Sequence, residues 1–279
     1  MGVGSFFSQS IAMNFNKWKN SQKKFKKFLS YFSNQSQYMI DKKTNQDIEN
    51  FNFNPFYLPT DGLLGLISNF KNSLYYKRGK QDFSTTYSYS LNKSKNTLSF
   101  GYIENNLKSN QVNFMHKLHP NWLLEINSTH ENKESISENF DGKNYNLDQF
   151  KINPKMTYLF NESNRLNIYY QYSTNKNIIG NLESLKQQKI GISCSISNAE
   201  KINFTSDFNY FSNSFEGNSN SIIGYIIMEG LQVGSNYTWS ISAQKKLTKF
   251  LDLNLSYFGR KSENSNPIHN GTIQLRAMF

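Results

Sequence analysis

Apolar and polar residues alternate along most of the chain from Phe83 onward. Because successive side chains of a β-strand point to opposite sides, positions two apart share one face. The alternation predicts strands with one apolar and one hydrophilic face, as in the run Asn203, Thr205, Asp207 and Asn209 between apolar neighbours. The apolar positions fall in segments 83–91, 98–102, 112–118, 122–126, 150–160, 166–172, 190–196, 202–210, 231–243, 251–257 and 273–279.

Strand length separates membrane from soluble β-proteins. Several of these patterns persist for about 10 to 13 residues, whereas strands of soluble sandwiches average about 5 to 6 and membrane-spanning strands need about 9 to 11. No apolar run approaches the roughly 18 residues of a membrane helix, the nearest being Gly62 to Ile67 and Ile222 to Met228. The sequence predicts an all-β, antiparallel up-and-down transmembrane β-barrel of about 12 to 16 strands, or the C-terminal part of a larger barrel.

Connector lengths support the same architecture, because outer-membrane barrels alternate short periplasmic turns with longer external loops. Counting back from Phe279 gives about twelve strands, the first near Asn72 to Gly79, and puts the C-terminus on the short-turn side. Short turns are predicted near Asn92 to Asn96, His119 to Asn121, Asn161 to Asn164, Ser197 to Glu200 and Lys246 to Thr248. Longer connectors are predicted near Glu131 to Asn146, Ser173 to Leu185, Asn213 to Asn220 and Ser262 to Pro267, with a shorter one near Asn105 to Ser109.

The N-terminal part is harder to assign. We expect a barrel over residues 61–279, preceded in residues 1–60 by a basic segment that holds further strands or a periplasmic or amphipathic element. Phe7 to Trp18, Phe28 to Ile40 and Phe51 to Leu58 are candidate strands, and an odd strand count predicts truncation from a larger barrel. For residues 17–32, a basic amphipathic helix competes with a strand pair joined by a Lys-rich turn.

The chain ends in the manner of a barrel's closing strand, which commonly carries apolar residues at alternate positions and a final aromatic as an assembly signal. The positions of this predicted signal are Gly271, Ile273, Leu275, Ala277 and Phe279. An aromatic is usual two positions before the end, so Ala277 is a departure from that pattern.

The C-terminal half resembles the C-terminal barrels of Bacteroidota outer-membrane proteins. The resemblance lies in Leu247 to Asn254, Tyr257 to Ser262 and Gly271 to Phe279. It implies a location in the outer membrane of a Gram-negative bacterium, contact with outer-membrane lipid and recognition by the barrel-assembly machinery. It implies no particular activity.

Composition changes this picture little. The formal net charge is +11, but six lysines lie together between Lys17 and Lys27, which favours anionic lipid headgroups or an acidic partner over nucleic acid. Cys194 is the single cysteine, so no internal disulfide forms. Residues 1–12 lack the features of a secretory signal, so we expect a mature, engineered or truncated chain.

The hydrophilic face carries an excess of basic residues, which in a pore lumen favours anions. A narrow barrel can equally pair them with acidic residues in a closed interior, and a plugged or closed interior is favoured over an open one. The charged residues predicted to face the lumen are Lys117, Glu125, Lys151, Lys155, Lys189, Asp207, Asp252, Arg260 and Arg276.

Outward aromatics fit the belts that barrels place at the two membrane boundaries. The predicted interface aromatics are Trp122, Phe160, Tyr172, Tyr210 and Trp239. The polar segments Glu134 to Lys143 and Asn175 to Gly180 are candidates for external contacts. Loops that are merely solvated and bind nothing would have the same composition.

Sequence gives little sign of catalysis or cofactors. The four histidines show no metal-ligand spacing, and no catalytic, cofactor-binding or metal site is predicted. Ser128 and His130 are spaced as in outer-membrane phospholipases, but that family has the His before the Ser, and no third residue to orient the imidazole is evident. We expect a non-enzymatic barrel that serves as a passive pore or scaffold, with small solutes or proteins as partners and no nucleic acid. The alternative is a membrane anchor or secretion component whose N-terminal part is missing.

Overall fold

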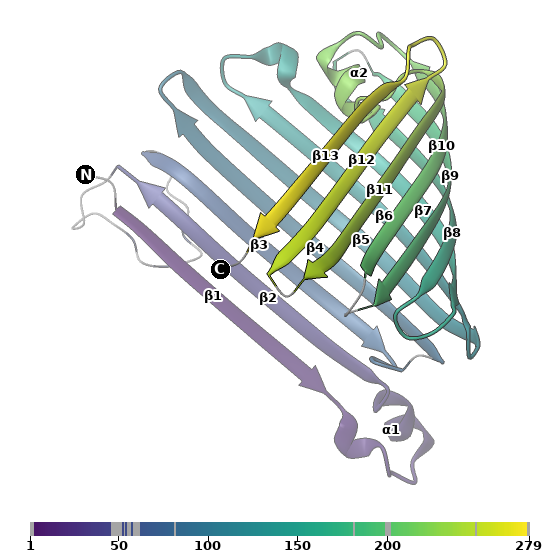
Figure 1. The fold of residues 1–279 in the computed structure, drawn as a ribbon. Helices are drawn as coiled ribbons and strands as arrows, with labels where there is room; N and C mark the ends of the chain where they lie inside the picture. Colours follow the sequence, from purple (N-terminus) through teal and green to yellow (C-terminus); the bar gives the residue numbers. More distant parts are fainter. Residues whose placement is uncertain are drawn as a thin grey trace. The chain divides into compact units, whose positions relative to one another are not determined.

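The computed structural model describes residues 3–45, 52, 54, 57, 62–80, 82–180, 182–198, 202–248 and 250–277. It contains one sheet in which thirteen antiparallel strands follow one another in chain order (Figure 1). The predicted all-β, antiparallel up-and-down fold class is confirmed, and the strand number falls within the predicted range. The strands are β1 (Val3–Asn14), β2 (Phe32–Thr44), β3 (Leu63–Tyr76), β4 (Phe83–Leu98), β5 (Gly101–His119), β6 (Trp122–Ser137), β7 (Tyr145–Leu159), β8 (Arg165–Asn177), β9 (Ser184–Asn198), β10 (Ile202–Glu216), β11 (Gly234–Thr248), β12 (Leu251–Ser262) and β13 (Ile268–Ala277).

The contacts divide the chain into two compact units. The first comprises residues 1–114, 128–150 and 176–182, and the second comprises residues 115–127, 151–175 and 183–279. Strands β1 to β4 therefore belong to the first unit and β9 to β13 to the second, while β5 to β8 contribute to both. Each unit is described by itself below.

In the first unit, the strand register places apolar and polar side chains on separate faces. Phe70 of β3 pairs with Tyr38 of β2 and with Leu91 of β4, so the three side chains share the apolar face. On the opposite face, Ser73 pairs with Ser88, and their hydroxyl oxygens are 2.9 Å apart. The alternation read from the sequence of β4 therefore corresponds to a real separation of faces.

The second unit shows the same separation. Ile192 of β9 pairs with Phe208 of β10, which pairs with Trp239 of β11, and these define its apolar face. Asp207 pairs with Ser193 on one side and Ser240 on the other, on the polar face. Register is strict in a two-faced sheet, since a slip of one residue would exchange the faces.

Burial is opposite to that of a soluble β-protein. In the second unit, most of the buried strand residues are polar and lie on the polar face, among them Gln187, Asn209, Asn213, Asn236, Asp252 and Ser262. The apolar face of the same strands exposes large side chains, including Ile192 (44% exposed) and Ile273 (77% exposed). A soluble protein rarely exposes so continuous an apolar surface.

Two connectors contain helical turns. Between β1 and β2 lie a 3₁₀ turn, η1 (Asn16–Trp18), and the short helix α1 (Lys24–Leu29), so the segment is a strand pair joined by a Lys-rich connector that includes one helical turn and a half. Between β10 and β11, residues 217–233 carry the helix α2 (Ile222–Ile227). A further 3₁₀ turn, η3 (Asp141–Lys143), connects β6 and β7.

Two predicted connectors of the first unit are wrong. Asn92 to Asn96 lies inside β4 and Asn105 to Ser109 lies inside β5, and these strands meet at the tight turn 99–100. The Asn, Ser and Lys residues that suggested turns are instead held by cross-strand partners, such as Lys93, whose ammonium lies 2.8 Å from the Glu104 carboxylate. Both faces are hydrophilic here, so the polar residues carry no turn signal.

The strand count changes accordingly. Leu98 ends β4 and Tyr102 belongs to β5, so the separate strand predicted around Phe100 does not exist. The strands from β3 to the C-terminus therefore number eleven, compared with the predicted count of about twelve. Strand β3 also begins at Leu63, before the predicted Asn72, and β11 begins at Gly234, so Leu231 and Val233 lie in the connector.

From β5 onward, the turn predicted at Lys246 to Thr248 is wrong, because these residues are the last of β11, and the connector predicted at Asn213 to Asn220 instead spans 217–233. The turns 120–121 and 160–164 and the longer connectors 138–144, 178–183 and 263–267 lie where they were expected, while Glu134 and Asn175 are strand residues. The predicted alternation of short turns with longer loops fails in the first unit, because the β1–β2 connector, on the side of the short turns, spans 15–31. The predicted division at residues 60/61 and most of the candidate strand Phe51 to Leu58 lie outside the described residues.

Three residues of that candidate strand are described. The carbonyl oxygens of Asn52, Asn54 and Tyr57 accept hydrogen bonds from the Lys42 ammonium at 2.9, 2.8 and 3.1 Å. Lys42 is buried on the apolar face of β2 beside Ile40. Over the described ranges, no helix combines the length and apolar character needed to cross a membrane.

Candidate functional site

The polar face of the second unit carries a hydrogen-bonded chain across four strands. The Gln187 side chain of β9 donates to the Asn213 side chain of β10 at 3.0 Å, and the Ser262 hydroxyl of β12 donates to the Asn236 side chain of β11 at 2.6 Å. Buried polar groups need such partners, since an unpaired one costs about 1 to 3 kcal/mol. The sequence places Asn, Gln and Ser at alternate positions here, which supplies both donors and acceptors.

The connector between β10 and β11 joins this chain. The Gln232 carbonyl accepts from the Asn213 amide at 2.9 Å and from the Asn236 amide at 2.7 Å, and the Gln232 N–H donates to the Asn236 oxygen at 3.0 Å. Asn213 and Asn236 are polar-face residues. We call residues 217–233 the α2 connector, and these bonds hold its final residues over the polar face.

The helix of this connector is locally well defined. The Ser221 hydroxyl caps α2 by accepting from the Gly224 N–H at 2.9 Å. Ile223, Ile227 and Met228 are buried, while Ile222 and Tyr225 are exposed. Gly224 is required by space, because a Cβ there would lie 2.6 Å from the Asn218 carbonyl oxygen. The α2 connector is therefore a packed element, seen beside the ends of β10 and β11 in Figure 1.

A second cluster lies on the polar face around Tyr169 of β8. Its hydroxyl donates toward the Asp207 carboxylate at 2.7 Å and the Asn209 oxygen at 2.6 Å, and Asn209 also bonds Asp207. The ring crosses Gly191 of β9, where the absence of a Cβ leaves room for it. The cluster thus links strands β8, β9 and β10.

Replacing Gly191 with Ala should destabilise the fold. The new methyl group would overlap the Tyr169 ring and lie 2.5 Å from the Asn209 oxygen, and overpacking of this kind costs about 1 to 3 kcal/mol. Urea unfolding of the protein in lipid vesicles measures the change. Gly271→Ala is the matched control, because nothing lies within 4 Å of that position. Equal stability of the two variants would contradict the close packing at Gly191.

Lys189 connects the Tyr169 cluster to the α2 connector. Its ammonium lies 5.2 Å from the ring centres of both Tyr169 and Phe211. It also interacts electrostatically with the carboxylates of Asp207 and of Glu229, a residue of the α2 connector. The positive charge of Lys189 therefore lies beside the Tyr169 cluster and is favoured by a carboxylate of the α2 connector.

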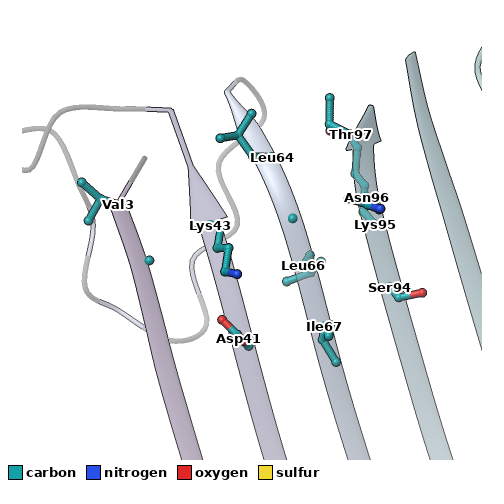
Figure 2. Close-up of a pocket in the computed structure, with 12 residues that line it drawn as sticks. Val3, Asp41, Lys43, Leu64, Leu66, Ile67, Ser94, Lys95, Asn96 and Thr97 are labelled. Carbon is teal, nitrogen blue, oxygen red and sulfur yellow. The ribbon is translucent and has the colours of Figure 1, made fainter. Parts of the chain in front are cut away.

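The first unit has a hollow at one end of its strands. The hollow measures about 640 Å³ and is lined by β1 to β4, as Figure 2 shows. Asp41, Lys43, Ser94 and Asn96 contribute polar groups, and Gly65 beside Lys43 contributes no side chain. Val3, Leu64, Leu66 and Ile67 contribute apolar groups to the same hollow.

All nine charged residues predicted to face the lumen lie on the polar face, by the alternation of their strands. Two of them, Lys155 and Glu125, form an ion pair of 2.5 Å. Asp252 pairs with Arg276 in the register of β12 and β13, and Arg260 pairs with Ile268. Lys189 and Asp207 meet in the Tyr169 cluster, whereas Lys117 and Lys151 form no ion pair within the described residues.

The five predicted interface aromatics lie on the apolar face. Trp122 and Phe160 both contact Tyr158, with ring centres 4.9 Å apart in each case, beside the turns 120–121 and 160–164. Tyr210 lies 5.2 Å from Tyr237, and Trp239 covers Gly259. Tyr172 shares the apolar side of β8 by strand alternation.

Four positions of the predicted assembly signal are described. Gly271, Ile273, Leu275 and Ala277 lie on the apolar face of β13, paired with Tyr257, Leu255, Leu253 and Leu251 of β12. Phe279 lies outside the described residues. The described positions therefore share one face, as the prediction requires.

Ser128 and His130 also share the apolar side of β6. The ring of His130 bonds the Asp148 carboxylate at 2.9 Å, an orienting partner that the sequence did not reveal. Within the described part of the chain, Ser128 and His130 are not hydrogen-bonded to each other. No group of three potential metal-binding side chains occurs among the described residues.

Sequence reasoning missed the residues that organise the polar face. Tyr169 lies between Ile168 and Tyr170, which both belong to the alternating apolar positions of β8. Tyr169 itself falls on the opposite face, so the apolar pattern does not include it. A signal for the cluster existed in Gly191, because an isolated glycine within a strand often marks close approach of another group. The α2 segment was noticed only as a short apolar run.

Comparison with known proteins gives little further guidance. Neither the protein-family models nor the curated proteins compared contain a match. Among solved structures, the chain is similar to the transport unit of the autotransporter AIDA-I from Escherichia coli, with 12% identity, a TM-score of 0.33, and coverage of 100% of this chain and 89% of that one. A similarity of this size says nothing about what the protein does.

Proposed function

We propose that the protein is an outer-membrane β-barrel whose apolar face contacts lipid and whose polar face surrounds an aqueous interior. The observation that carries the proposal is the inverted burial, in which Asn236 is fully buried while Ile192 and Ile273 are exposed. Lipid is the solvent that makes such an apolar face favourable, and strands that satisfy their backbone groups in a sheet are suited to cross it.

The dimensions of the apolar face support this proposal. On β10, apolar-face residues run from Ile202 to Tyr210 before Ser212 and Ser214 follow on the same face. That span matches the roughly 9 to 11 residues of a membrane-crossing strand. Tyr210 and Tyr237 at one limit, and Trp122 and Phe160 near the turns of β5–β8, suit interface belts.

The C-terminal strand supports the same location. Its alternate apolar positions and the resemblance to C-terminal barrels of Bacteroidota outer-membrane proteins favour insertion by the barrel-assembly machinery. The proposed location is the outer membrane of a Gram-negative bacterium.

We propose passive, porin-like transport of small solutes as the activity, restricted by the α2 connector. Its bonds to Asn213 and Asn236 and the electrostatic attraction between Glu229 and Lys189 support a covering element over the interior. The basic excess among the nine charged residues favours anions over cations. We propose no catalytic step and no cofactor.

Planar-bilayer conductance tests this activity. Replacing residues 219–228 with a short Gly-Ser linker should raise the single-channel conductance severalfold and retain anion selectivity, because the cover is removed while the charged wall remains. The unmodified chain should show small or intermittent conductance. A cation-selective current in both proteins would contradict the assigned selectivity.

The second candidate function is a membrane anchor or secretion component. The filled polar face of the second unit favours it, because the Gln187–Asn213 and Asn236–Ser262 bonds occupy space that a wide pore would leave open. Absence of conductance even without the α2 connector would support the anchor and exclude the pore.

A further inference from the structure

Basic residues are concentrated in two neighbouring connectors of the first unit. The β1–β2 connector contributes six lysines and no acidic residue, and the β3–β4 connector contributes three basic residues with Asp82. We call these nine residues the basic end: Lys17, Lys19, Lys23, Lys24, Lys26, Lys27, Lys77, Arg78 and Lys80. A single carboxylate within the two connectors cannot neutralise nine cations.

The two connectors form one surface. The Lys77 N–H donates to the Tyr31 carbonyl at 2.8 Å, which joins the β3–β4 connector to the end of the β1–β2 connector. A hollow of about 320 Å³ lies between them and is lined by Lys19, Tyr31, Lys77, Arg78 and Lys80, among others. The lining includes four cationic residues and no carboxylate, so the hollow suits an anionic group such as a phosphate.

Aromatic rings, rather than carboxylates, are the recorded neighbours of several of these cations. The ammonium groups of Lys17 and Lys26 lie 5.5 and 5.9 Å from the Trp18 ring centre, and that of Lys80 lies 5.8 Å from Tyr31. The ion pairs recorded in the described residues, such as Lys93–Glu104, lie elsewhere. Contacts with aromatic faces leave the positive charge available to an external anion.

Exposed aromatic residues accompany the charge. Phe25 of α1 is 71% exposed and Phe28 is 49% exposed. Phe28 contacts Phe32, whose ring lies 5.0 Å from Tyr76, and Tyr76 contacts Phe83 at 5.9 Å. Phe32, Tyr76 and Phe83 belong to the ends of β2, β3 and β4, so an aromatic belt leads directly into the basic end.

We propose that the basic end binds the headgroups of anionic phospholipids in the bilayer leaflet nearest α1. This inference rests on the proposed membrane location. An aromatic belt followed by a cationic layer is the order that a membrane interface favours, because rings prefer the headgroup boundary and lysines prefer anionic phosphates. Phe25 inserts at the boundary, and the hollow beside Lys19 and Lys77 takes a phosphate.

Fluorescence quenching by brominated lipids tests the proposal on the whole chain. With Trp122→Phe and Trp239→Phe, Trp18 remains as the reporter inside the basic end. The protein is reconstituted in phosphatidylcholine vesicles, and insertion is verified by a heat-modifiable gel band. We expect brominated phosphatidylglycerol at low mole fraction to quench Trp18 far more strongly than brominated phosphatidylcholine.

Two matched charge variants complete the experiment. Replacing Lys23, Lys24, Lys26 and Lys27 with Gln should weaken the selectivity for phosphatidylglycerol at least tenfold, since each basic residue at an anionic surface favours binding by about fivefold. Replacing the exposed residues Lys108, Lys143, Lys176 and Lys186 with Gln removes the same charge and should leave the selectivity unchanged.

The outcomes are distinguishable. Inserted protein with equal quenching by both lipids, or with selectivity that survives the first variant, overturns lipid binding and leaves the membrane location intact. Selective binding of soluble polyphosphate without selective lipid quenching also overturns it and identifies a soluble polyanion as the partner. Failure to insert, without a heat-modifiable band, contradicts the proposed function itself.

Discussion

Ile192→Arg should impair insertion severely, because Ile192 lies within the apolar band of β9, between Ile190 and Cys194. An arginine at the middle of the bilayer on the lipid face of a barrel costs about 2 to 4 kcal/mol. Refolding yield and urea unfolding in phosphatidylcholine vesicles measure the effect. We expect a lower yield and a loss of unfolding free energy of that size.

Gln188→Arg is the matched control, since Gln188 lies on the same strand and the same face but outside the apolar band, and it is exposed. An exposed surface change usually alters stability by no more than about 0.5 kcal/mol. In a soluble protein, Ile192 would be an equally exposed surface position, and both variants would behave alike. Equal refolding of the two variants would therefore contradict contact between this face and lipid.

Asn236→Ala should produce the second large loss, because Asn236 is fully buried and takes part in four recorded hydrogen bonds of the polar face. Its removal leaves the Gln232 N–H and the Ser262 hydroxyl without this partner. With a cost of about 1 to 3 kcal/mol for each buried unpaired group, we expect a loss of about 2 to 3 kcal/mol.

The same variant should release the α2 connector and increase current fluctuations in bilayers, since Gln232 loses both its donor and its acceptor in β11. Asn270→Ala provides the comparison, because Asn270 is an exposed residue on the polar side of β13. Stability and current equal to those of the comparison variant would show that Asn236 does not hold the connector.

Sequence periodicity predicted most of the strands because the two faces of this sheet meet different surroundings. In β9 and β10, Ile190, Ile192, Phe208 and Tyr210 alternate with polar residues, and the register confirms the shared face. The connectors at 120–121, 160–164 and 263–267 were placed correctly, because both turn chemistry and the loss of alternation mark them.

Prediction failed where both faces are hydrophilic. In β4 and β5, residues 92–96 and 105–109 carry Lys, Asn and Ser on both sides, so no period distinguishes a strand from a connector there. The pairing that stabilises them, such as Lys93 with Glu104 and Tyr87 with Asn110, joins residues of adjacent strands. Sequence order alone does not reveal that register.

The sequence predicted which face of the sheet the site residues occupy, but it did not predict the contacts between them. Strand alternation was sufficient to assign Lys189 and Asp207 to the polar face. It could not show that Tyr169 crosses Gly191 to reach Asp207, because that contact depends on side-chain direction and on the register of three strands. The position of the α2 connector over the same face depends on its hydrogen bonds with Asn213 and Asn236. These residues belong to the flanking strands, and nothing in their local sequence indicates that they bind the connector.

The most direct test of the membrane account is to fold the chain into lipid vesicles and compare its gel mobility before and after boiling, together with its circular dichroism. The account predicts a β-rich species whose mobility changes on boiling, and which requires lipid or detergent to stay in solution. A β-rich monomer that stays in solution without detergent would contradict it, because the exposed apolar face would then meet water.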